Sequence, residues 1–314
     1  MIAIGIDVGG MSVKGAAIKE NGEVLDRFSC PTDNSASPEE MIGKVCELVN
    51  GLLQEHHYRD KIVGIGIGIP GTFNKETGVV VHCPNLPTWE GFHLKEFMEE
   101  RCKLYVKMVN DADAAALAEA KFGAAKDANY VLMITLGTGV GGGIVINKNL
   151  YNGNLGTGAE LGHMIIQMDG ELCGCGRRGC LEAYASASAL IRDTKRAVEL
   201  HPESLIQEEA DKFEGAYARA VFSAEKLGDP IAKELVDNYV KYLCEGLLNY
   251  CNIFRPNVIV LSGGIANEGE NLLKRVRAYM KKHNYGMKNT PEVEIKLATC
   301  GYDAGKIGAA ALYF

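Results

Sequence analysis

Two stretches of the chain share one hydrophobic pattern. Residues 2–7 read as a buried strand that runs into a glycine turn, and residues 13–18 read as the returning strand. Residues 130–136 and 141–146 repeat this order around a second glycine-rich turn, and a polar turn follows in both cases. Repetition of one supersecondary unit indicates an internal duplication. We therefore predict two similar halves, with the boundary near residues 117–128.

The rest of the chain alternates between strand and helix patterns. Residues 62–69 alternate Ile or Val with Gly, so one face of that strand is bulky and the other is bare enough for a helix to approach closely. Asp229 and Pro230 predict an N-cap followed by proline in the first helical position. The other predicted strands are 23–29, 105–109, 257–261 and 292–297, and the predicted helices are 38–53, 111–122, 230–254, one from about 268, and 303–312.

Composition and charge exclude several classes of protein. The 314 residues are 47% hydrophobic and 23% charged, which is too apolar for a disordered chain. The net charge of -7 argues against a nucleic-acid-binding surface spread over the chain. No apolar run approaches about 18 residues, so we expect no membrane span. The first residues do not resemble a signal peptide, so we expect a cytoplasmic protein with reduced cysteines.

Three glycine-rich turns follow buried strands, at Asp7–Lys14, Leu136–Gly143 and Ser262–Gly264. Glycines let backbone N–H groups approach a phosphate without side-chain collision. Each turn alone also fits a purely structural role, but together they indicate phosphate and nucleoside binding. Asp7 is a candidate for holding Mg²⁺, directly or through water. The candidate nucleotide-binding residues are Asp7, Gly9, Gly10, Ser12, Lys14, Gly137, Thr138, Gly139, Gly263 and Gly264.

Three cysteines and one histidine have the spacing of a metal site. His163 precedes Cys173, Cys175 and Cys180, and glycines between the cysteines let the loop bend around an ion. Three thiolates and one imidazole make a closed tetrahedral Zn²⁺ site, which is typical of a structural metal. The alternative is free thiols in a loop.

Several carboxylates and amides are candidates for chemistry. Asn110 and Asp111 begin a predicted helix, where Asp111 is either a cap or a general base that the helix N-terminus keeps ionised. Glu160, His163 and Glu182 flank the predicted zinc loop, and such groups pair well with sugar hydroxyls. The alternative for the two glutamates is a place on the solvated surface.

These motifs, in this order, resemble the ROK family of sugar kinases, within the actin-like ATPase superfamily, and most of all its bacterial glucokinases. The resemblance covers essentially the whole chain, and the Cys-x-Cys-Gly-x-x-Gly-Cys-x-Glu string is its most specific part. It implies an α/β, ribonuclease H-like fold of two similar domains with a cleft between them. We expect residues 1–118 to form the first domain and residues 119–302 the second, which carries the zinc loop. The helix at 303–314 is expected to pack back on the first.

The resemblance also implies roles for single residues. Asp111 matches the catalytic base, which takes the proton from the sugar hydroxyl. The matching sugar contacts are Gly71, Asn85, Asn110, Glu160, His163 and Glu182, and His163 also ligates zinc. Gly9, Gly10, Thr138 and Gly264 match nucleotide contacts. The loop Pro87–Phe92 is expected to border the sugar, which would make Trp89 a fluorescent reporter of sugar binding.

The expected reaction is transfer of the γ-phosphoryl group of Mg-ATP to a hexose, most directly to O6 of glucose. Two departures from the family pattern stand out: Met11 replaces a usual Thr, for which Ser12 would substitute, and Asp113 stands where Asn is common. The alternatives are kinases for N-acetylmannosamine, N-acetylglucosamine, fructose or allose, polyphosphate as donor, and a sugar-responsive regulator without kinase activity. The family also implies a homodimer or homotetramer.

Overall fold

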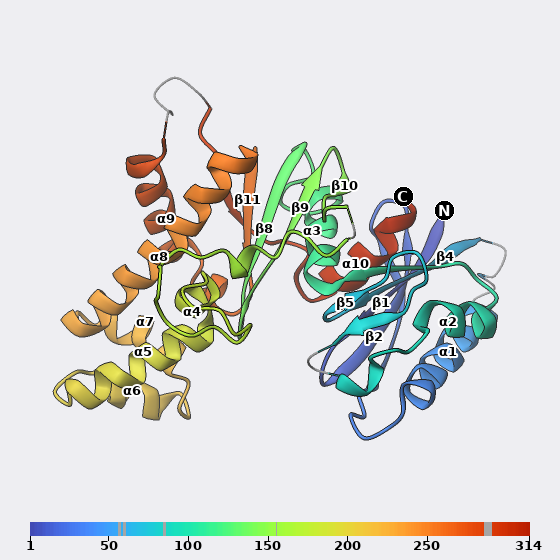
Figure 1. The fold of residues 1–314 in the computed structure, drawn as a ribbon, viewed down its shortest axis with the longest axis horizontal. Helices are drawn as coiled ribbons and strands as arrows, with labels where there is room; N and C mark the ends of the chain where they lie inside the picture. The colour runs from blue at the N-terminus through green and yellow to red at the C-terminus, as the bar shows by residue number, and fades with distance from the viewer. Residues whose placement is uncertain (56–57, 59–60, 84–85, 155, 286–290) are drawn as a thin grey trace. The chain divides into compact units, whose positions relative to one another are not determined.

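The first part of the chain forms a mixed five-stranded sheet (Figure 1). The computed structural model describes residues 1–314 except 56–57, 59–60, 84–85, 155 and 286–290. The strand order is β3-β2-β1-β4-β7, in which β1, β2 and β3 are antiparallel and β4 and β7 continue parallel to β1. The bounds are β1 Ile2–Val8, β2 Ser12–Lys19, β3 Val24–Pro31, β4 Ile62–Ile69 and β7 Val106–Asn110.

The two faces of this sheet differ in side-chain size. Isoleucines of β1 and β4 point into a core that α1 (Pro38–Glu55) and α2 (Leu94–Cys102) complete. Glycines of the same strands point to the opposite face, where α10 (Ala304–Ala310) lies. A Cβ added at Gly66 would lie 1.8 Å from the carbonyl oxygen of Ala309, so the helix backbone rests directly on the strand. This confirms the bare face predicted for residues 62–69.

A short hairpin and a turn of 3₁₀ helix precede α2. The hairpin pairs β5 (Thr72–Phe73) with β6 (Val80–His82), and η1 spans Pro87–Trp89. Trp89 is only 1% exposed and packs edge-on against Phe92 inside the α1 and α2 core. The ring therefore lies in the core and not on the loop surface, and the place of the loop beside the sugar stays a prediction. The large apolar ring of Trp89 gains more from burial in the core than from a place in a surface loop.

The second sheet repeats the topology of the first. Its order is β10-β9-β8-β11-β12. As in the first sheet, the first three strands of the sheet lie side by side in reverse order, and the two later strands follow next to the first of them. Strands β9 and β10 are antiparallel, and β11 and β12 are parallel. This shared order confirms the predicted duplication. The bounds are β8 Tyr130–Leu136, β9 Val140–Ile146, β10 Asn149–Leu150, β11 Val258–Ser262 and β12 Glu294–Leu297.

Helices dominate the segment between β10 and β12. The longest is α8, and the side chain of Asp229 caps it by accepting the N–H of Ala232 at 2.8 Å. The predicted cap and its following proline are thus confirmed. The bounds are α4 Glu182–Ala185, α5 Ala187–Leu200, α6 Ile206–Lys212, α7 Tyr217–Lys226, α8 Pro230–Phe254 and α9 Glu270–His283. Short 3₁₀ turns are η2 Leu161–His163, η3 Ile265–Glu268, η4 Gly301–Asp303 and η5 Ala311–Tyr313.

The chain divides into two compact units. Unit 1 contains Met1–Val131, Gly143–Ala159 and Ala298–Phe314, and unit 2 contains Leu132–Gly142 and Glu160–Leu297. In unit 1, α3 (Asp111–Lys121) and α10 pack together. None of the helices among the described residues combines the length and the apolar character that a membrane span requires.

A buried carboxylate ties the end of α3 to the segment before α10. Glu119 is fully buried, and its Oε1 accepts the N–H groups of Thr299 and Cys300 at 2.8 and 2.7 Å. Its Oε2 accepts the N–H of Ala124 at 2.8 Å. Bonds from neutral donors to an ionised acceptor are stronger than neutral pairs, so this carboxylate is a major anchor of unit 1.

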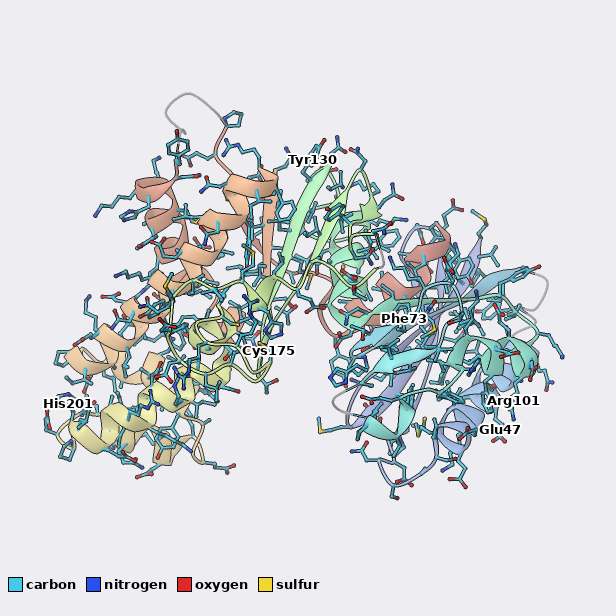
Figure 2. The ribbon with its side chains drawn as sticks, in the orientation of Figure 1. Glu47, Phe73, Arg101, Tyr130, Cys175 and His201 are labelled. Carbon is cyan, nitrogen blue, oxygen red and sulfur yellow. The ribbon has the colours of Figure 1, made fainter. Side chains whose placement is uncertain are left out.

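We expect Glu119→Gln to lower the free energy of unfolding by about 2–4 kcal/mol, because the amide brings donors to a place where three backbone N–H groups already need acceptors. Urea unfolding followed by circular dichroism measures the change. The matched control is Glu47→Gln on the exposed face of α1 (Figure 2), which should leave the midpoint in place. Equal midpoints for both variants would contradict the anchoring role.

Candidate functional site

The first glycine turn joins β1 to β2 in unit 1. The N–H of Gly9 donates to the carbonyl of Ser12 at 3.0 Å, which closes the turn. Thr32, at the end of β3, donates its hydroxyl to the carbonyl of Gly9 at 2.7 Å. Sequence reasoning missed Thr32, since only the pairing of β3 with β2 brings it there. Met11 is 88% exposed, so its side chain extends into solvent.

Asp7 lies beside this turn, on the face of the sheet that α10 covers. Its register partner on β2 is Lys14, and a Cβ added at Gly305 would lie 2.7 Å from the Asp7 carboxyl carbon. Burial raises the pKa of Asp7, while the charges of Lys14 and Lys306 act in the opposite direction. Lys306 is buried, with its Nζ 2.6 Å from Oδ1 of Asp303. No local pattern in the sequence indicates that Lys306 lies near Asp7.

The start of α3 holds Asn110 and Asp111 in different roles. Asn110 is the N-cap: its Oδ1 accepts the N–H of Ala112 at 2.9 Å, and its Nδ2 donates to the carbonyl of Gly71 at 3.1 Å. Asp111 is the first helical residue and is exposed, with its Oδ1 accepting the N–H of Ala112 at 2.9 Å. The structure therefore gives the cap to Asn110 and turns the Asp111 carboxylate to solvent.

In unit 2 the second and third glycine turns meet. Gly137 and Gly139 close the turn between β8 and β9 through a 3.0 Å backbone bond. Gly263 has a φ of +91°, and a Cβ there would lie 2.4 Å from the carbonyl oxygen of Leu136. Only glycine fits this contact, which brings the end of β11 against the end of β8. Two of the three predicted nucleotide-binding turns are thus neighbours.

Glu182 connects the second turn to the cysteine loop. Its Oε2 accepts the N–H of Val140 at 3.0 Å, and its Oε1 lies 3.4 Å from Sγ of Cys173. The lack of a side chain at Gly139 makes room for this carboxylate, because a Cβ there would lie 2.3 Å from Oε2. Glu182 is therefore a half-buried link and not a surface carboxylate, whereas Glu160 is exposed.

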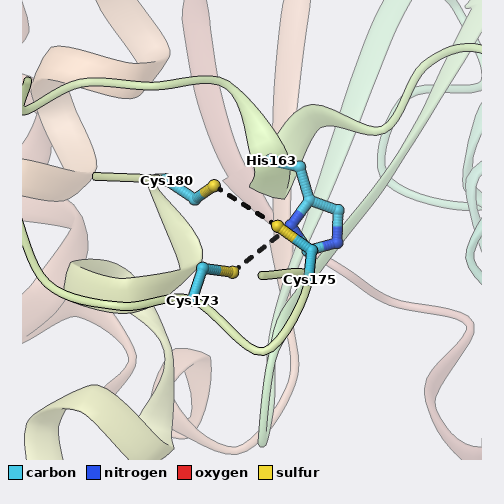
Figure 3. Close-up of side chains that lie close together, drawn as sticks. All are labelled: His163, Cys173, Cys175 and Cys180. Carbon is cyan, nitrogen blue, oxygen red and sulfur yellow. Dashed lines mark hydrogen bonds between the residues drawn. The ribbon is translucent and has the colours of Figure 1, made fainter. Parts of the chain in front are cut away.

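The predicted zinc ligands converge in unit 2 (Figure 3). The ligand atoms of His163, Cys173, Cys175 and Cys180 all lie within 4.8 Å of one another. Nδ1 of His163 is 3.6 Å from Sγ of Cys173, and the sulfurs of Cys175 and Cys180 are 3.7 Å apart. Ligand atoms around tetrahedral Zn²⁺ are about 3.5–3.8 Å apart, so the donor set fits this ion. Burial raises the pKa of Cys173 to about 12.

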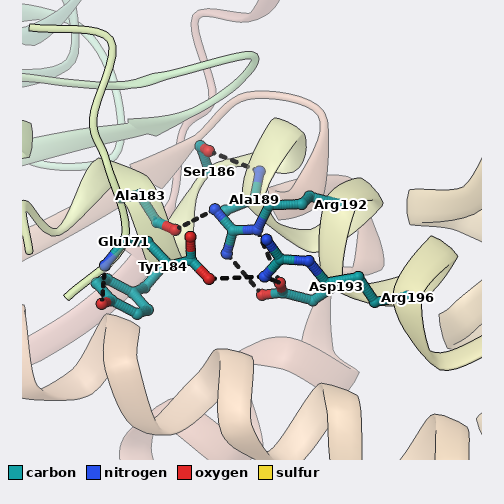
Figure 4. Close-up of polar contacts among 8 residues, drawn as sticks. All are labelled: Glu171, Ala183, Tyr184, Ser186, Ala189, Arg192, Asp193 and Arg196. Atoms are coloured by element: carbon teal, nitrogen blue, oxygen red, sulfur yellow. Dashed lines mark hydrogen bonds and ion pairs between the residues drawn. The ribbon is translucent and has the colours of Figure 1, made fainter.

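The loop that carries the cysteines is anchored to α4 and α5 (Figure 4). The N–H of Glu171 donates to the hydroxyl of Tyr184 at 2.7 Å, and Arg196 forms a 2.6 Å ion pair with the Glu171 carboxylate. The neighbouring Arg196 lowers the pKa of Glu171. Arg192 donates to the carbonyl of Ala183 at 3.0 Å. The two contacts of Glu171 fix the chain just before Cys173, and the Arg192 bond joins α5 to α4.

The turn that carries His163 is anchored from α8. Tyr250 is fully buried, and its hydroxyl donates to the carbonyl of Leu161 at 2.5 Å. On the other side, Gly162 lies against the backbone of Val140 on β9. Sequence reasoning did not single out Tyr250, which sits in an ordinary hydrophobic position of a long helix. Asn85, a predicted sugar contact, lies outside the described residues.

Comparisons with known proteins agree with this architecture. The ROK family profile matches residues 3–314. The glucokinase of Halalkalibacterium halodurans is 37% identical over 98% of this chain and 94% of its own length. The ROK hexokinase of Thermus thermophilus superposes with a TM-score of 0.82 and 32% identity over 99% of this chain and 97% of that one.

A ROK family glucokinase from Streptomyces griseus, crystallised in complex with glucose and AMPPNP, superposes with a TM-score of 0.79. It is 33% identical, and the match covers 99% of both chains. The predicted α/β fold of the actin-like ATPases is confirmed by these structural matches. The chain belongs to the ROK family.

Proposed function

We propose that this protein is an ATP- and Mg²⁺-dependent hexose kinase that phosphorylates O6 of glucose. The observation that carries the proposal is the start of α3, where Asn110 takes over capping and leaves the carboxylate of Asp111 exposed. The full-length similarity to glucokinases supports the substrate, since those relatives cover nearly the whole chain.

Asp111 is the proposed general base. Its carboxylate accepts the proton of the sugar O6 hydroxyl while O6 attacks the γ-phosphorus of ATP. The bond from that phosphorus to the β,γ-bridging oxygen breaks, and the products are the 6-phosphosugar and ADP. Such reactions depend mainly on positioning and on stabilisation of charge around the transferred group. The bond from Asn110 to the Gly71 carbonyl supports a fixed position for Asp111.

The remaining roles follow the chemistry of each group. Glu160, His163 and Glu182, together with Gly71, Asn85 and Asn110, are the proposed sugar contacts. Carboxylates accept hydrogen bonds from sugar hydroxyls, and amides both donate and accept them. One carboxylate oxygen of Glu182 accepts the N–H of Val140, and the carboxylate has further acceptor sites for sugar hydroxyls.

The three glycine turns are the proposed nucleotide site. Gly9, Gly10 and Ser12 would offer amides and a hydroxyl to the phosphates, and Lys14 a positive charge. Gly137, Thr138, Gly139, Gly263 and Gly264 would contact the rest of the nucleotide. Asp7 would hold the Mg²⁺ that accompanies ATP, and this ion neutralises phosphate charge.

His163, Cys173, Cys175 and Cys180 would hold one Zn²⁺. Four protein ligands would fill a tetrahedral Zn²⁺ site without an open position, so the ion would fix the loop and take no part in phosphoryl transfer. Oε1 of Glu182 lies 3.4 Å from Sγ of Cys173. The zinc loop would therefore help to position Glu182, which is a proposed contact to the sugar.

The experiment that tests the proposal is sugar-dependent release of ADP from Mg-ATP. The panel contains glucose, fructose, allose, N-acetylglucosamine and N-acetylmannosamine. In a parallel series polyphosphate replaces ATP, and the sugar phosphate that forms is measured. We expect the highest kcat/KM with glucose and ATP. A site that hydrogen-bonds every hydroxyl of its substrate discriminates strongly against analogues that leave a buried polar group unpaired.

Each other outcome corrects a defined part of the proposal. A preference for an acetylated amino sugar keeps the kinase and changes the substrate. Turnover with polyphosphate alone changes the donor. Binding of sugar without its phosphorylation by either donor contradicts the kinase and favours a sugar-responsive regulator.

A further inference from the structure

We propose that Lys75, Asn152 and Asp113 form a hydrogen-bonded chain that positions Asp111. None of the three side chains touches the reacting atoms in this proposal, so all three are positioning residues. The inference rests on the proposed role of Asp111 as the base, and it concerns what holds that carboxylate in place.

Asp111 lies between two anchored neighbours. On its N-terminal side, Asn110 donates to the carbonyl of Gly71 at 3.1 Å. On its C-terminal side, Asp113 accepts a hydrogen bond from Nδ2 of Asn152 at 3.2 Å. Asn152 follows β10 and is far from α3 in sequence, so this contact exists only in the folded unit 1.

The chain continues from Asn152 to Lys75. Nζ of Lys75 donates to Oδ1 of Asn152 at 2.5 Å. The alkyl part of Lys75 also lies over Gly156, where an added Cβ would be 2.1 Å from its Cε. Lys75 is thus held by two points of the segment that follows β10.

Both anchors of Asp111 lead to one hairpin. Gly71 directly precedes β5, and Lys75 lies in the turn between β5 and β6. Strand β5 and helix α3 both belong to unit 1 (Figure 1). The hairpin therefore contacts the start of α3 directly through Gly71 and indirectly through Lys75 and Asn152. Residues on both sides of Asp111 are therefore linked to the same segment, Gly71–Lys75.

The hydrogen bonds from Lys75 through Asn152 to Asp113 can run in only one donor-to-acceptor direction. A lysine ammonium only donates, and an ionised carboxylate only accepts. Asn152 must therefore turn its oxygen to Lys75 and its NH₂ group to Asp113. Asp113 is 6% exposed, and a buried carboxylate is costly unless donors reach it. Because the orientation of the Asn152 amide is fixed, replacing its NH₂ group by an oxygen removes the donor to Asp113.

The test exploits this polarity through Asn152→Asp, which is nearly isosteric. The variant loses the donor to Asp113 and places two carboxylates side by side, which repel each other. The double variant Asn152→Asp with Asp113→Asn restores the chain, because the new amide donates to the new carboxylate and Lys75 still donates to it. Asn149→Asp is the matched control, since Asn149 is exposed on β10 and its side chain donates locally to the carbonyl of Asn147 at 2.8 Å.

We expect Asn152→Asp to lower kcat about tenfold or more, because small displacements of a catalytic group have large effects on rate. The KM values for sugar and ATP should stay within about threefold, since the chain touches neither substrate. The double variant should recover kcat to within about threefold of wild type, and Asn149→Asp should match wild type. Steady-state kinetics and thermal unfolding are measured on every variant.

Wild-type kcat in Asn152→Asp, or no recovery in the double variant, would overturn the inference. Should Asn152→Asp fail to fold, Lys75→Met breaks the chain at an exposed residue and should also lower kcat, with recovery in Lys75→Arg. Unchanged kcat in Lys75→Met would again overturn it. Failure of the wild type to phosphorylate any sugar contradicts the proposed function itself, which separates the two results.

Discussion

Asp111→Asn is expected to lower kcat by about 10²–10⁴-fold while glucose binding is retained. The amide has the shape of the carboxylate, and its oxygen can still accept the N–H of Ala112, which Asp111 accepts at 2.9 Å. It cannot take up the proton of the sugar hydroxyl at neutral pH. Steady-state kinetics give kcat, and isothermal titration gives the affinity for glucose.

The control for this prediction is Asp127→Asn, which removes the same charge from an exposed position of unit 1. Equal thermal unfolding midpoints for the two variants and wild type would show that the fold is intact. Turnover by Asp111→Asn within a few-fold of wild type would contradict the assignment of the base. Loss of glucose binding together with turnover would show that Asp111 acts mainly as a sugar ligand.

Cys180→Ser is expected to abolish stoichiometric zinc and to destabilise unit 2. Wild-type protein should carry one Zn²⁺ per chain, because the ligand atoms of three cysteines and one histidine already lie within 4.8 Å of one another. Cys180 is fully buried, so the serine hydroxyl has neither the ligand strength of a thiolate nor access to water. Since the metal is bound only by the folded loop, its loss should lower the thermal unfolding midpoint.

Metal content is measured by mass spectrometry of purified protein, with and without a strong chelator. Cys30→Ser is the control, because Cys30 is a half-buried cysteine on β3, outside the cluster. Wild-type protein with no bound metal would contradict the prediction. Zinc at full stoichiometry in Cys180→Ser would show that three ligands suffice and that Cys180 has another role.

Glu182 links the proposed zinc site to the proposed sugar site. Its carboxylate reaches the amide of Val140 in the second glycine turn and lies 3.4 Å from Cys173. A loop that loses its metal would shift Cys173, and Glu182 with it. We therefore expect the KM for sugar to rise in Cys180→Ser more than the KM for ATP.

Local patterns in the sequence predicted most of the fold. The alternation of Ile and Gly in residues 62–69 predicted a strand with one bare face, and α10 lies on that face. Asp229 and Pro230 predicted the start of α8. The spacing of the cysteines predicted which side chains would converge. In each case the determining interaction lies within a few residues, or depends on a periodic pattern, so it can be read without knowledge of the path of the chain.

The tertiary structure decided what no local signal encodes. Glu119 finds two of its backbone donors 180 and 181 positions further along the chain. Asn152 meets Asp113 only because β10 returns beside α3. The sequence predicts a loop around Trp89, whereas the structure buries this side chain in the core. A side chain's partners across the fold depend on how strands and helices pack, because hydrogen bonds and burial act over a few ångströms in space and are indifferent to distance along the sequence.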